Sequence, residues 1–340
     1  MQYTKLGSSG AVVSRFALGT MTFGSATDKD EAHQQLSTFL DAGGTLIDTA
    51  DIYTDGTSEE IVGAWLQSLD EPARSQVFLA GKARFPVGVT ARDAGLSRRH
   101  LRRALDASLT RLGVDHIDLY QLHAWDPLTP IEESLDFLAD AVRLGKISYA
   151  GVSNFTGWQT ATAAAYARGR LPLVSAQPQY NLLTREVEWE ILPASEAAGL
   201  AVLPWSPLGG GWLTGKYTRN ANPAGATRLG DNAAADGVEA YHRRVDLDRT
   251  WAVIDQLAAI AADRETTSAT IALAWLLSRP AVTSLILGAR TTEQLVANLG
   301  AGEMTLSGEE LRLLDEASDP HPADYPYGQP GRDQRSRPMN

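Results

Sequence analysis

The sequence predicts one (β/α)8 barrel, because of the number of its apolar runs and the pattern within them. Eight short runs rich in β-forming residues recur along the 340 residues, with helical periodicity between them. Their apolar residues are continuous rather than alternating, which is typical of parallel strands covered on their faces. Eight such units close most naturally into a barrel. The runs are 16–20, 45–50, 77–83, 117–123, 147–153, 173–180, 201–207 and 282–288.

The connections between the early runs carry the helical signals. Apolar residues recur at helical spacing over 30–43, 58–69, 97–113 and 131–145, and several of these segments close on a glycine suited to a helix end. A doubly wound open sheet is the alternative with this element order. Its dinucleotide fingerprint, GxGxxG after the first strand, is missing, because the first run continues into GTMTFG at 19–24.

Three segments depart from the repeat. Residues 3–15 predict a hairpin that turns at Ser8, Ser9 and Gly10 and plugs the bottom of the barrel. Residues 208–246 have no sustained apolar period and are too long for an ordinary connection, so they are a candidate lid. We expect one domain over 1–319 and a surface or disordered tail over 320–340.

The composition excludes several classes of protein. A net charge of −11 opposes nonspecific binding to nucleic acid or to an anionic membrane. The absence of cysteine excludes disulfides, thiolate nucleophiles and cysteine-bound zinc. Neither a signal peptide nor an apolar stretch near ~20 residues is visible, so we expect a cytoplasmic protein. Without coiled-coil heptads or an apolar surface stripe, the oligomeric state stays open.

Polar residues follow the apolar runs at the end where barrels of this type carry their chemistry. An ammonium within an apolar strand needs a carboxylate partner, and Asp48 on the adjacent strand is the natural partner of Lys82. That cation would lower the pKa of a neighbouring tyrosine from ~10 toward a value useful for proton transfer. We expect Asp51 to face solvent or to cap a loop. The strand-end residues are Asp48, Tyr53, Lys82, His123, Ser153, Asn154 and Gln177.

Six motifs follow one another along the chain: DTADIY at 48–53, GK at 81–82, RLGVDHIDLYQLH at 111–123, GKISYAGVSNF at 145–155, WSPLGGGWLTGKY at 205–217 and GARTTEQLVANLGA at 288–301. In these motifs the sequence resembles the aldo-keto reductases, a family of NAD(P)H-dependent carbonyl reductases built on the (β/α)8 barrel. The resemblance implies that Tyr53 is the general acid in reduction, with Asp48, Lys82 and His123 tuning or orienting it. The later motifs are most similar to the branch of potassium-channel β subunits and bacterial sugar or aryl-aldehyde reductases.

The resemblance also implies where a nicotinamide cofactor would bind. Its carboxamide would be held at the barrel mouth by Ser153, Asn154 and Gln177, with Trp205 stacked on the ring, and a glycine-rich loop would let backbone approach the pyrophosphate. The implied contacts come from Gly19, Thr20, Met21, Asp48, Ser153, Asn154, Gln177, Trp205, Ser206, Pro207, Leu208, Gly209, Gly211, Gly215, Lys216, Gly288, Arg290, Gln294 and Asn298.

The adenosine end departs from the best-known reductase pattern. Gly288, Ala289 and Gln294 stand where many relatives carry Lys, Ser and Arg around a 2′-phosphate. Arg290 keeps a guanidinium that can bind this phosphate bidentately, and Gln294 and Asn298 suit hydrogen bonds to phosphate and adenine. The sequence therefore favours NADPH (NADP+) over NADH.

The implied reaction is transfer of the pro-R hydride from nicotinamide C4 to a small-molecule carbonyl compound, an aldehyde or ketone. We expect Tyr53 and His123 to contact this substrate, with apolar walls from Met21, Phe23, Trp125 and Trp212. The alternative within the family is a regulatory or redox-sensing subunit that binds NADPH and turns over slowly. A glycosidase using Asp48 with Asp126 or Asp51 is less favoured. A metal site is not expected, because the histidines lack ligand spacing.

Overall fold

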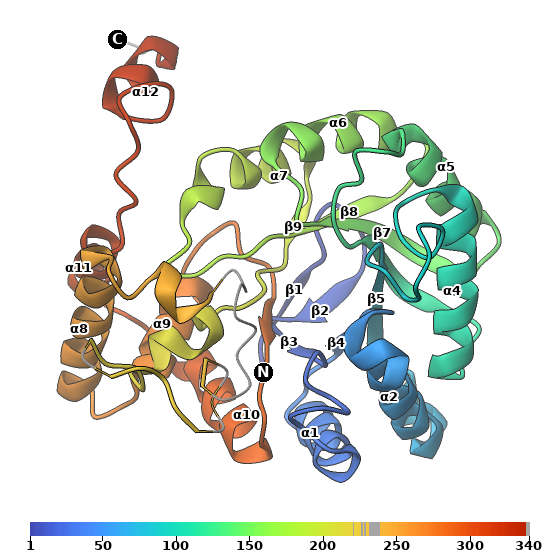
Figure 1. The fold of residues 1–340 in the computed structure, drawn as a ribbon, viewed down its shortest axis with the longest axis horizontal. Helices are drawn as coiled ribbons and strands as arrows, with labels where there is room; N and C mark the ends of the chain where they lie inside the picture. Colours follow the sequence, from blue (N-terminus) through green and yellow to red (C-terminus); the bar gives the residue numbers. More distant parts are fainter. Residues whose placement is uncertain (220, 226, 228, 231–238, 338–340) are drawn as a thin grey trace.

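Eight parallel strands form the wall of a (β/α)8 barrel in the computed structural model, which describes residues 1–219, 221–225, 227, 229–230 and 239–337 (Figure 1). Each predicted run contains one strand, so the predicted fold class is confirmed. Backbone hydrogen bonds from Thr283 to Val202 (2.9 Å) and from Ile286 to Pro204 (3.0 Å) join the last strand to the one before it. In spatial order the strands are β10 (Leu285–Leu287), β3 (Phe16–Gly19), β4 (Leu46–Asp48), β5 (Phe78–Ala83), β6 (Ile117–Leu122), β7 (Ile147–Ser153), β8 (Leu173–Gln177) and β9 (Ala201–Val202).

Helices surround the strands and follow them along the chain. The four helices predicted from periodicity are present, and local chemistry explains their ends. The Asp28 side chain accepts from the Glu31 amide at the start of α1, and Gly113 ends α4 with a φ of 64°. The helices are α1 (Lys29–Asp41), α2 (Thr57–Ser68), α3 (Glu71–Arg74), α4 (Arg98–Leu112), α5 (Ile131–Arg143), α6 (Gly157–Ala167), α7 (Ile191–Ala198), α8 (Asp248–Asp263), α9 (Ser268–Leu277), α10 (Thr292–Leu299), α11 (Gly308–Ala317) and α12 (Gln329–Arg335).

The predicted hairpin is confirmed as strands β1 (Tyr3–Lys5) and β2 (Val12–Ser14), which pair antiparallel. Leu6 and Val13 are fully buried, in one cluster with inward-facing strand residues such as Leu46. The hairpin therefore fills the end of the barrel where the strands begin.

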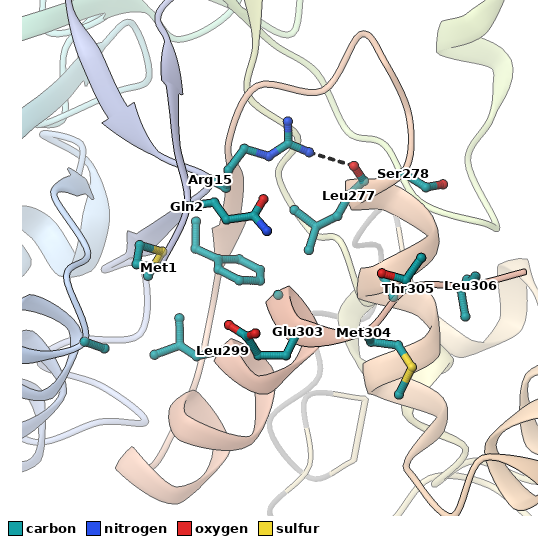
Figure 2. Close-up of a pocket in the computed structure, with 14 residues that line it drawn as sticks. Met1, Gln2, Arg15, Leu277, Ser278, Leu299, Glu303, Met304, Thr305 and Leu306 are labelled. Atoms are coloured by element: carbon teal, nitrogen blue, oxygen red, sulfur yellow. Dashed lines mark hydrogen bonds between the residues drawn. The ribbon is translucent and has the colours of Figure 1, made fainter.

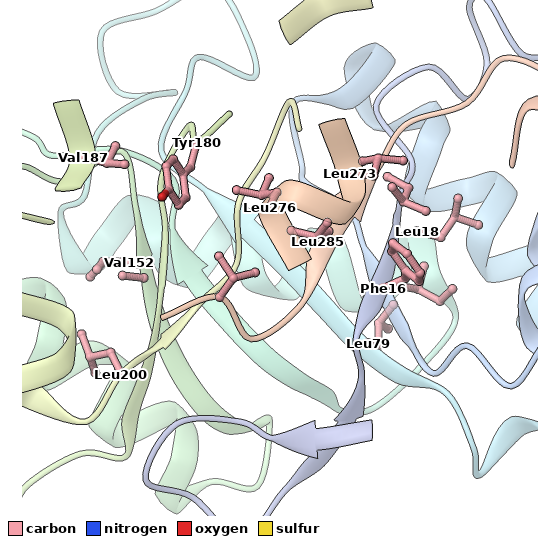
Figure 3. Close-up of a cluster of buried hydrophobic side chains, with 14 of the residues drawn as sticks. Phe16, Leu18, Leu79, Val152, Tyr180, Val187, Leu200, Leu273, Leu276 and Leu285 are labelled. Atoms are coloured by element: carbon pink, nitrogen blue, oxygen red, sulfur yellow. The ribbon is translucent and has the colours of Figure 1, made fainter. Parts of the chain in front are cut away.

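The larger core lies between the strands and the surrounding helices. Figure 3 shows strand residues Leu18 and Leu285 near Leu273 of α9 within this cluster of buried side chains. Because each strand is covered by the hairpin and inner residues on one face and by helices on the other, its sequence is apolar without alternation.

A cavity of about 380 Å³ lies at the opposite end from the predicted chemistry (Figure 2). Its walls include Met1, Gln2 and Arg15, near the start of β3, and residues at the end of α9 such as Leu277. The Arg15 guanidinium donates to the Leu277 carbonyl at 2.6 Å and so caps α9. None of the predicted site residues lines this cavity.

The long connection and the tail are described in part. The connection contains short 3-10 turns η3 (Gly209–Thr214) and η4 (Tyr241–Arg243), but residues 220, 226, 228 and 231–238 of the candidate lid lie outside the described residues. In the tail, the Tyr327 ring stacks on Trp189 at 5.2 Å between centroids. Residues 338–340 also lie outside the description. Along the described chain, no helix is both long and apolar enough to cross a membrane.

Replacing Leu6 by alanine tests the role of the hairpin. Leu6 has no exposed surface, so Leu6→Ala should leave a cavity and lower the free energy of unfolding by about 3 kcal/mol. The control Val12→Ala, at a side chain 57% exposed on the same hairpin, should cost under about 1 kcal/mol. Urea unfolding followed by circular dichroism measures both. Equal losses would mean that the hairpin does not seal the barrel.

Candidate active site

Four side chains meet at the carboxyl ends of β4, β5 and β6. Asp48 is the last residue of β4, and His123 follows β6 directly. Lys82 lies in β5, which is the strand between β4 and β6, and it pairs in register with Gln121 of β6. Tyr53 begins the 3-10 turn η1 (Tyr53–Gly56), which leads from β4 into α2. Residues far apart in the sequence therefore converge because neighbouring parallel strands end together.

Lys82 is the centre of this group. It has no exposed surface, and its ammonium donates to Asp48 Oδ2 (2.8 Å), to the Thr49 carbonyl (2.8 Å) and to the Tyr53 hydroxyl (3.1 Å). An ammonium has three N–H donors, so these contacts satisfy it. Burial alone lowers the pKa of Lys82, but the charge of Asp48, together with Tyr53, outweighs burial and raises it. Lys82 is therefore a cation beside the phenol of Tyr53.

His123 faces the same group and is neutral. Burial, followed by the positive charges of Lys82 and Arg84, holds the pKa of His123 well below its usual range. Its ring meets the Tyr53 ring edge to face at 5.9 Å between centroids, and Nδ1 is buried without a hydrogen-bond partner among the described residues. A neutral imidazole in this position can orient an oxygen atom by a hydrogen bond, and it carries no acidic proton.

A second hydrogen-bond network links the predicted carboxamide-binding residues to this group. Gln177 Nε2 donates to Asp48 Oδ1 (2.9 Å), and the Ser153 hydroxyl donates to the Gln177 carbonyl (2.9 Å). Asn154, which has a φ of 56°, donates to the His123 carbonyl (2.9 Å) and accepts from the Trp205 indole (3.1 Å). These bonds hold Trp205 and the three polar side chains in place around the mouth.

The residues at the end of β3 lie on the same side of the mouth. Thr20 is buried, and its hydroxyl donates to the Asp48 carbonyl at 3.2 Å. Gly19 is packed so tightly that a Cβ there would approach Ile286 to 2.8 Å. Met21 is 42% exposed, so it is the member of this group that a ligand can contact most readily.

The glycine-rich segment after β9 has the backbone shape that only glycine adopts easily. Gly209, Gly210, Gly211 and Gly215 all have positive φ, and a Cβ on Gly211 would approach Lys216 Nζ to 2.6 Å. The Ser206 hydroxyl donates to Glu239 Oε1 at 2.5 Å. Pro207 is buried, Leu208 half-buried and Lys216 exposed.

The residues predicted for the adenosine end surround the start of α10. The Gln294 side-chain oxygen accepts from the Arg290 amide at 3.0 Å, which leaves its NH2 group for other partners. Arg290 and Asn298 are half-buried. Gly288 is exposed, and no atom of the described residues lies within 4 Å of the position that a Cβ would take. The side-chain N–H groups of Arg290, Gln294 and Asn298, together with the exposed backbone at Gly288, could contact a nucleotide.

Two of the apolar residues predicted to line the substrate pocket do not lie at the barrel mouth. Phe23 and Trp212 have no exposed surface, so neither borders the mouth as the sequence predicts. Trp212 instead stacks on Tyr241 at 5.2 Å between centroids, and its indole donates to the Glu239 carbonyl. Large apolar side chains in long connections pack into the core because burial stabilises them more than exposure at the rim. Trp125 remains half-buried, with its ring edge to face with Phe155 and Trp158.

Sequence reasoning missed Arg84 and Phe85, which follow β5. The Phe85 ring lies 4.7 Å from the His123 ring between centroids, and the Arg84 guanidinium carbon lies 5.1 Å from the Phe85 ring centroid. The signal was present in the strand alternation, since Arg84 lies two residues beyond Lys82 and shares its face.

The prediction for Asp51 was wrong. Asp51 is 1% exposed, and neither of its carboxylate oxygens has a hydrogen-bond partner among the described residues. Its backbone amide donates to the Lys82 carbonyl (3.1 Å), which turns the side chain inward near Glu59 of α2. Burial, and then the negative charge of Glu59, raise the pKa of Asp51 to about 7 against the opposing charge of Arg111.

Comparison with known proteins agrees with this geometry. Residues 15–319 match the Aldo/keto reductase family, and the chain belongs to this family. It is 40% identical to the Bacillus subtilis protein named "Uncharacterized oxidoreductase YrpG", over 93% of this chain and 95% of that protein. It is 37% identical to the "Probable voltage-gated potassium channel subunit beta" of Oryza sativa subsp. japonica, over 88% and 91%. It is 32% identical to the "Versiconal hemiacetal acetate reductase" of Aspergillus parasiticus, over 95% and 100%. The chain is therefore an oxidoreductase of the aldo/keto reductase family.

The buried carboxyl of Asp51 should make stability depend on pH. The unfolded chain loses this proton near pH 3.9 and the folded chain near pH 7, so the folded state holds it more tightly between these values. Raising the pH from 5 to 8 should therefore cost about 2–3 kcal/mol through Asp51, and Asp51→Asn should remove that part of the loss.

Urea unfolding at pH 5 and pH 8 measures this difference. Asp55→Asn, at an exposed carboxyl in the same turn, is the matched control and should leave the pH dependence as in wild type. Some pH dependence should persist in Asp51→Asn, because burial also raises the pKa of Glu59. A loss unchanged by Asp51→Asn would show that the folded state does not hold a proton there.

Proposed function

We propose that the protein is an NADPH-dependent carbonyl reductase that acts on a small aldehyde or ketone. The observation that supports this most directly is the contact of the Lys82 ammonium with the Tyr53 hydroxyl at 3.1 Å, beside a neutral His123. A phenol next to a fixed cation releases its proton more readily, which is the property a general acid needs.

Each residue of the group then has a distinct part in the reaction. A bound nicotinamide would supply the hydride. Tyr53 gives its proton to the carbonyl oxygen, and Lys82 stabilises the phenolate that remains. Asp48 keeps Lys82 charged and oriented, since the pair is buried. His123 donates a hydrogen bond that orients the carbonyl oxygen.

The surroundings of the group suit a nicotinamide dinucleotide. Trp205 is half-buried and held by Asn154, so its ring can stack on a flat ligand. The positive-φ glycines from 209 to 215 let backbone approach a pyrophosphate, and Lys216 adds a cation. Arg290 would bind a 2′-phosphate, which is the basis for preferring NADPH to NADH. We place the reaction in the cytoplasm.

A second candidate function is that of a regulatory subunit that binds the cofactor and turns over slowly. The similarity to a protein named as a probable potassium-channel β subunit favours it. Steady-state oxidation of NADPH with 4-nitrobenzaldehyde separates the two. Sustained turnover supports the reductase, whereas tight NADPH binding without turnover supports the regulatory subunit.

Replacing Tyr53 by phenylalanine removes the proposed acid and little else. Tyr53→Phe should lower kcat for 4-nitrobenzaldehyde by about 10²–10⁴-fold, the usual contribution of a positioned acid. NADPH affinity, measured by fluorescence titration, should stay within a few-fold of wild type. The control Tyr325→Phe, at a side chain 70% exposed, should have wild-type activity. Turnover retained in Tyr53→Phe would remove Tyr53 from the acid role.

Replacing Arg290 tests cofactor choice. Arg290→Ala should weaken NADPH binding by about 10–100-fold, the value of a charge-assisted hydrogen bond to phosphate, and NADH binding by less than about threefold. The control Arg99→Ala, at an exposed arginine of α4, should change neither. Equal losses for both cofactors in Arg290→Ala would mean that the 2′-phosphate is held elsewhere.

A further inference from the structure

Arg84 lies at the mouth of the barrel beside His123. Side chains alternate along a strand, so Arg84 shares the inner face with Lys82, one layer nearer the mouth. The register of β5 with β6 continues past Lys82, since the His123 amide donates to the Ala83 carbonyl at 3.1 Å. This brings Arg84 next to His123, in agreement with the effect of its charge on that imidazole.

The guanidinium of Arg84 has no anionic partner within the described chain. Among the described residues no carboxylate lies within 4 Å of it, and its Nε is buried without a hydrogen-bond partner there. Its one described contact is with the Phe85 ring. Other half-buried guanidinium groups have hydrogen-bond acceptors, as Arg111 has the Glu59 carboxylate and Arg15 has the Leu277 carbonyl. A half-buried cation without a counter-charge is unfavourable unless a ligand supplies one.

An acidic residue near Arg84, Asp126, already accepts hydrogen bonds from its own loop. Burial raises the pKa of Asp126, but the hydrogen bonds that it accepts outweigh burial and lower it. The charge of Arg84 lowers this pKa by a smaller amount, so the two side chains lie near each other. One Asp126 oxygen accepts from the Leu96 amide (2.8 Å) and the Thr129 hydroxyl (2.7 Å), and the other accepts from the Leu128 amide (3.0 Å). Asp126 therefore holds its loop and leaves Arg84 without a direct partner.

The phosphates of a cofactor are an unsuitable partner because of their position. The glycine-rich segment follows β9 and Arg290 follows β10, and these two strands are neighbours where the barrel closes. Strand β5 lies three positions from β10 and four from β9 around the eight-stranded sheet. Arg84 is therefore across the mouth from the residues proposed to bind phosphate, on the side where the substrate carbonyl meets Tyr53 and His123.

We propose that Arg84 binds a carboxylate on the carbonyl compound that the site reduces, so that the substrate is an oxo acid. This inference rests on the proposed reductase function. A guanidinium presents two parallel N–H groups to a carboxylate and satisfies both charges at once. The body of the substrate would lie against the aromatic side chains on the same side, Phe85 and Trp125. A flat aldehyde with a carboxylate substituent matches this arrangement.

Pairs of aldehydes that differ only in charge test the proposal. The probes are 2-, 3- and 4-formylbenzoate and the methyl ester of each, assayed with NADPH. For at least one isomer, the wild-type kcat/KM of the acid should exceed that of its ester by tenfold or more. The three isomers place the carboxylate at three distances from the carbonyl, so one of them should reach Arg84.

Matched arginine variants assign the effect to Arg84. Arg84→Met should lower kcat/KM for the preferred acid by tenfold or more and leave its ester within threefold, while Arg84→Lys should restore part of the preference. Arg92→Met removes the same charge from an exposed position on the same loop and should keep the wild-type ratio. An acid-to-ester ratio that is the same in wild type and Arg84→Met would overturn the proposal.

Binding of a carboxylate that cannot be reduced separates this inference from the reductase function. Terephthalate should bind the wild-type protein, by isothermal titration calorimetry, at least tenfold more tightly than it binds Arg84→Met. If neither 4-nitrobenzaldehyde nor any of the six aldehydes is reduced but this difference is found, the reductase function fails and the anion site stands. Equal or absent binding in both proteins would overturn the site.

Discussion

The buried ion pair between Lys82 and Asp48 is the constraint on which the rest of the site depends. Neither charge could lie inside the barrel alone, because an unpaired buried ion costs several kcal/mol. Their contact at 2.8 Å is possible since β4 and β5 are adjacent parallel strands. Once Lys82 is fixed, its third donor fixes the Tyr53 hydroxyl, and the second oxygen of Asp48 fixes Gln177. The positions of these side chains at the mouth therefore depend on the three hydrogen bonds that the Lys82 ammonium donates.

Charge is distributed unevenly around that pair. Toward the mouth lie Arg84 and a His123 that two neighbouring cations help to keep neutral. Away from it lie the buried carboxyl groups of Asp51 and Glu59; Glu59 pairs with Arg111, whereas Asp51 has no such partner in the described part of the chain. The chain carries a net charge of −11, yet Arg84 at this side of the mouth has no carboxylate within 4 Å among the described residues. A net charge describes the average surface and says nothing about the field inside a site.

Most of the fold and the central group of the site were predictable, for physical reasons that act along short stretches. The continuous apolar runs predict parallel strands, and a lysine in such a run demands a carboxylate. The predictions failed for side chains whose position depends on contacts with several helices, strands or turns. The inward turn of Asp51 depends on a bond from its amide to Lys82, and the burial of Trp212 depends on Tyr241. The unpaired state of Arg84 depends on what Asp126 binds instead.

The sequence by itself determined the strand and helix order, the barrel, and the polar residues that follow the strands, because periodicity and residue type act locally. The tertiary structure decided which charges meet and which stay unpaired. Burial and hydrogen bonding are shared among neighbours from different elements, so the state of Asp51 or Arg84 is settled only when α2, β5 and β6 have packed. For that reason the family can be recognised from the sequence over residues 15–319, whereas the environment of Asp51 is evident only from the three-dimensional structure.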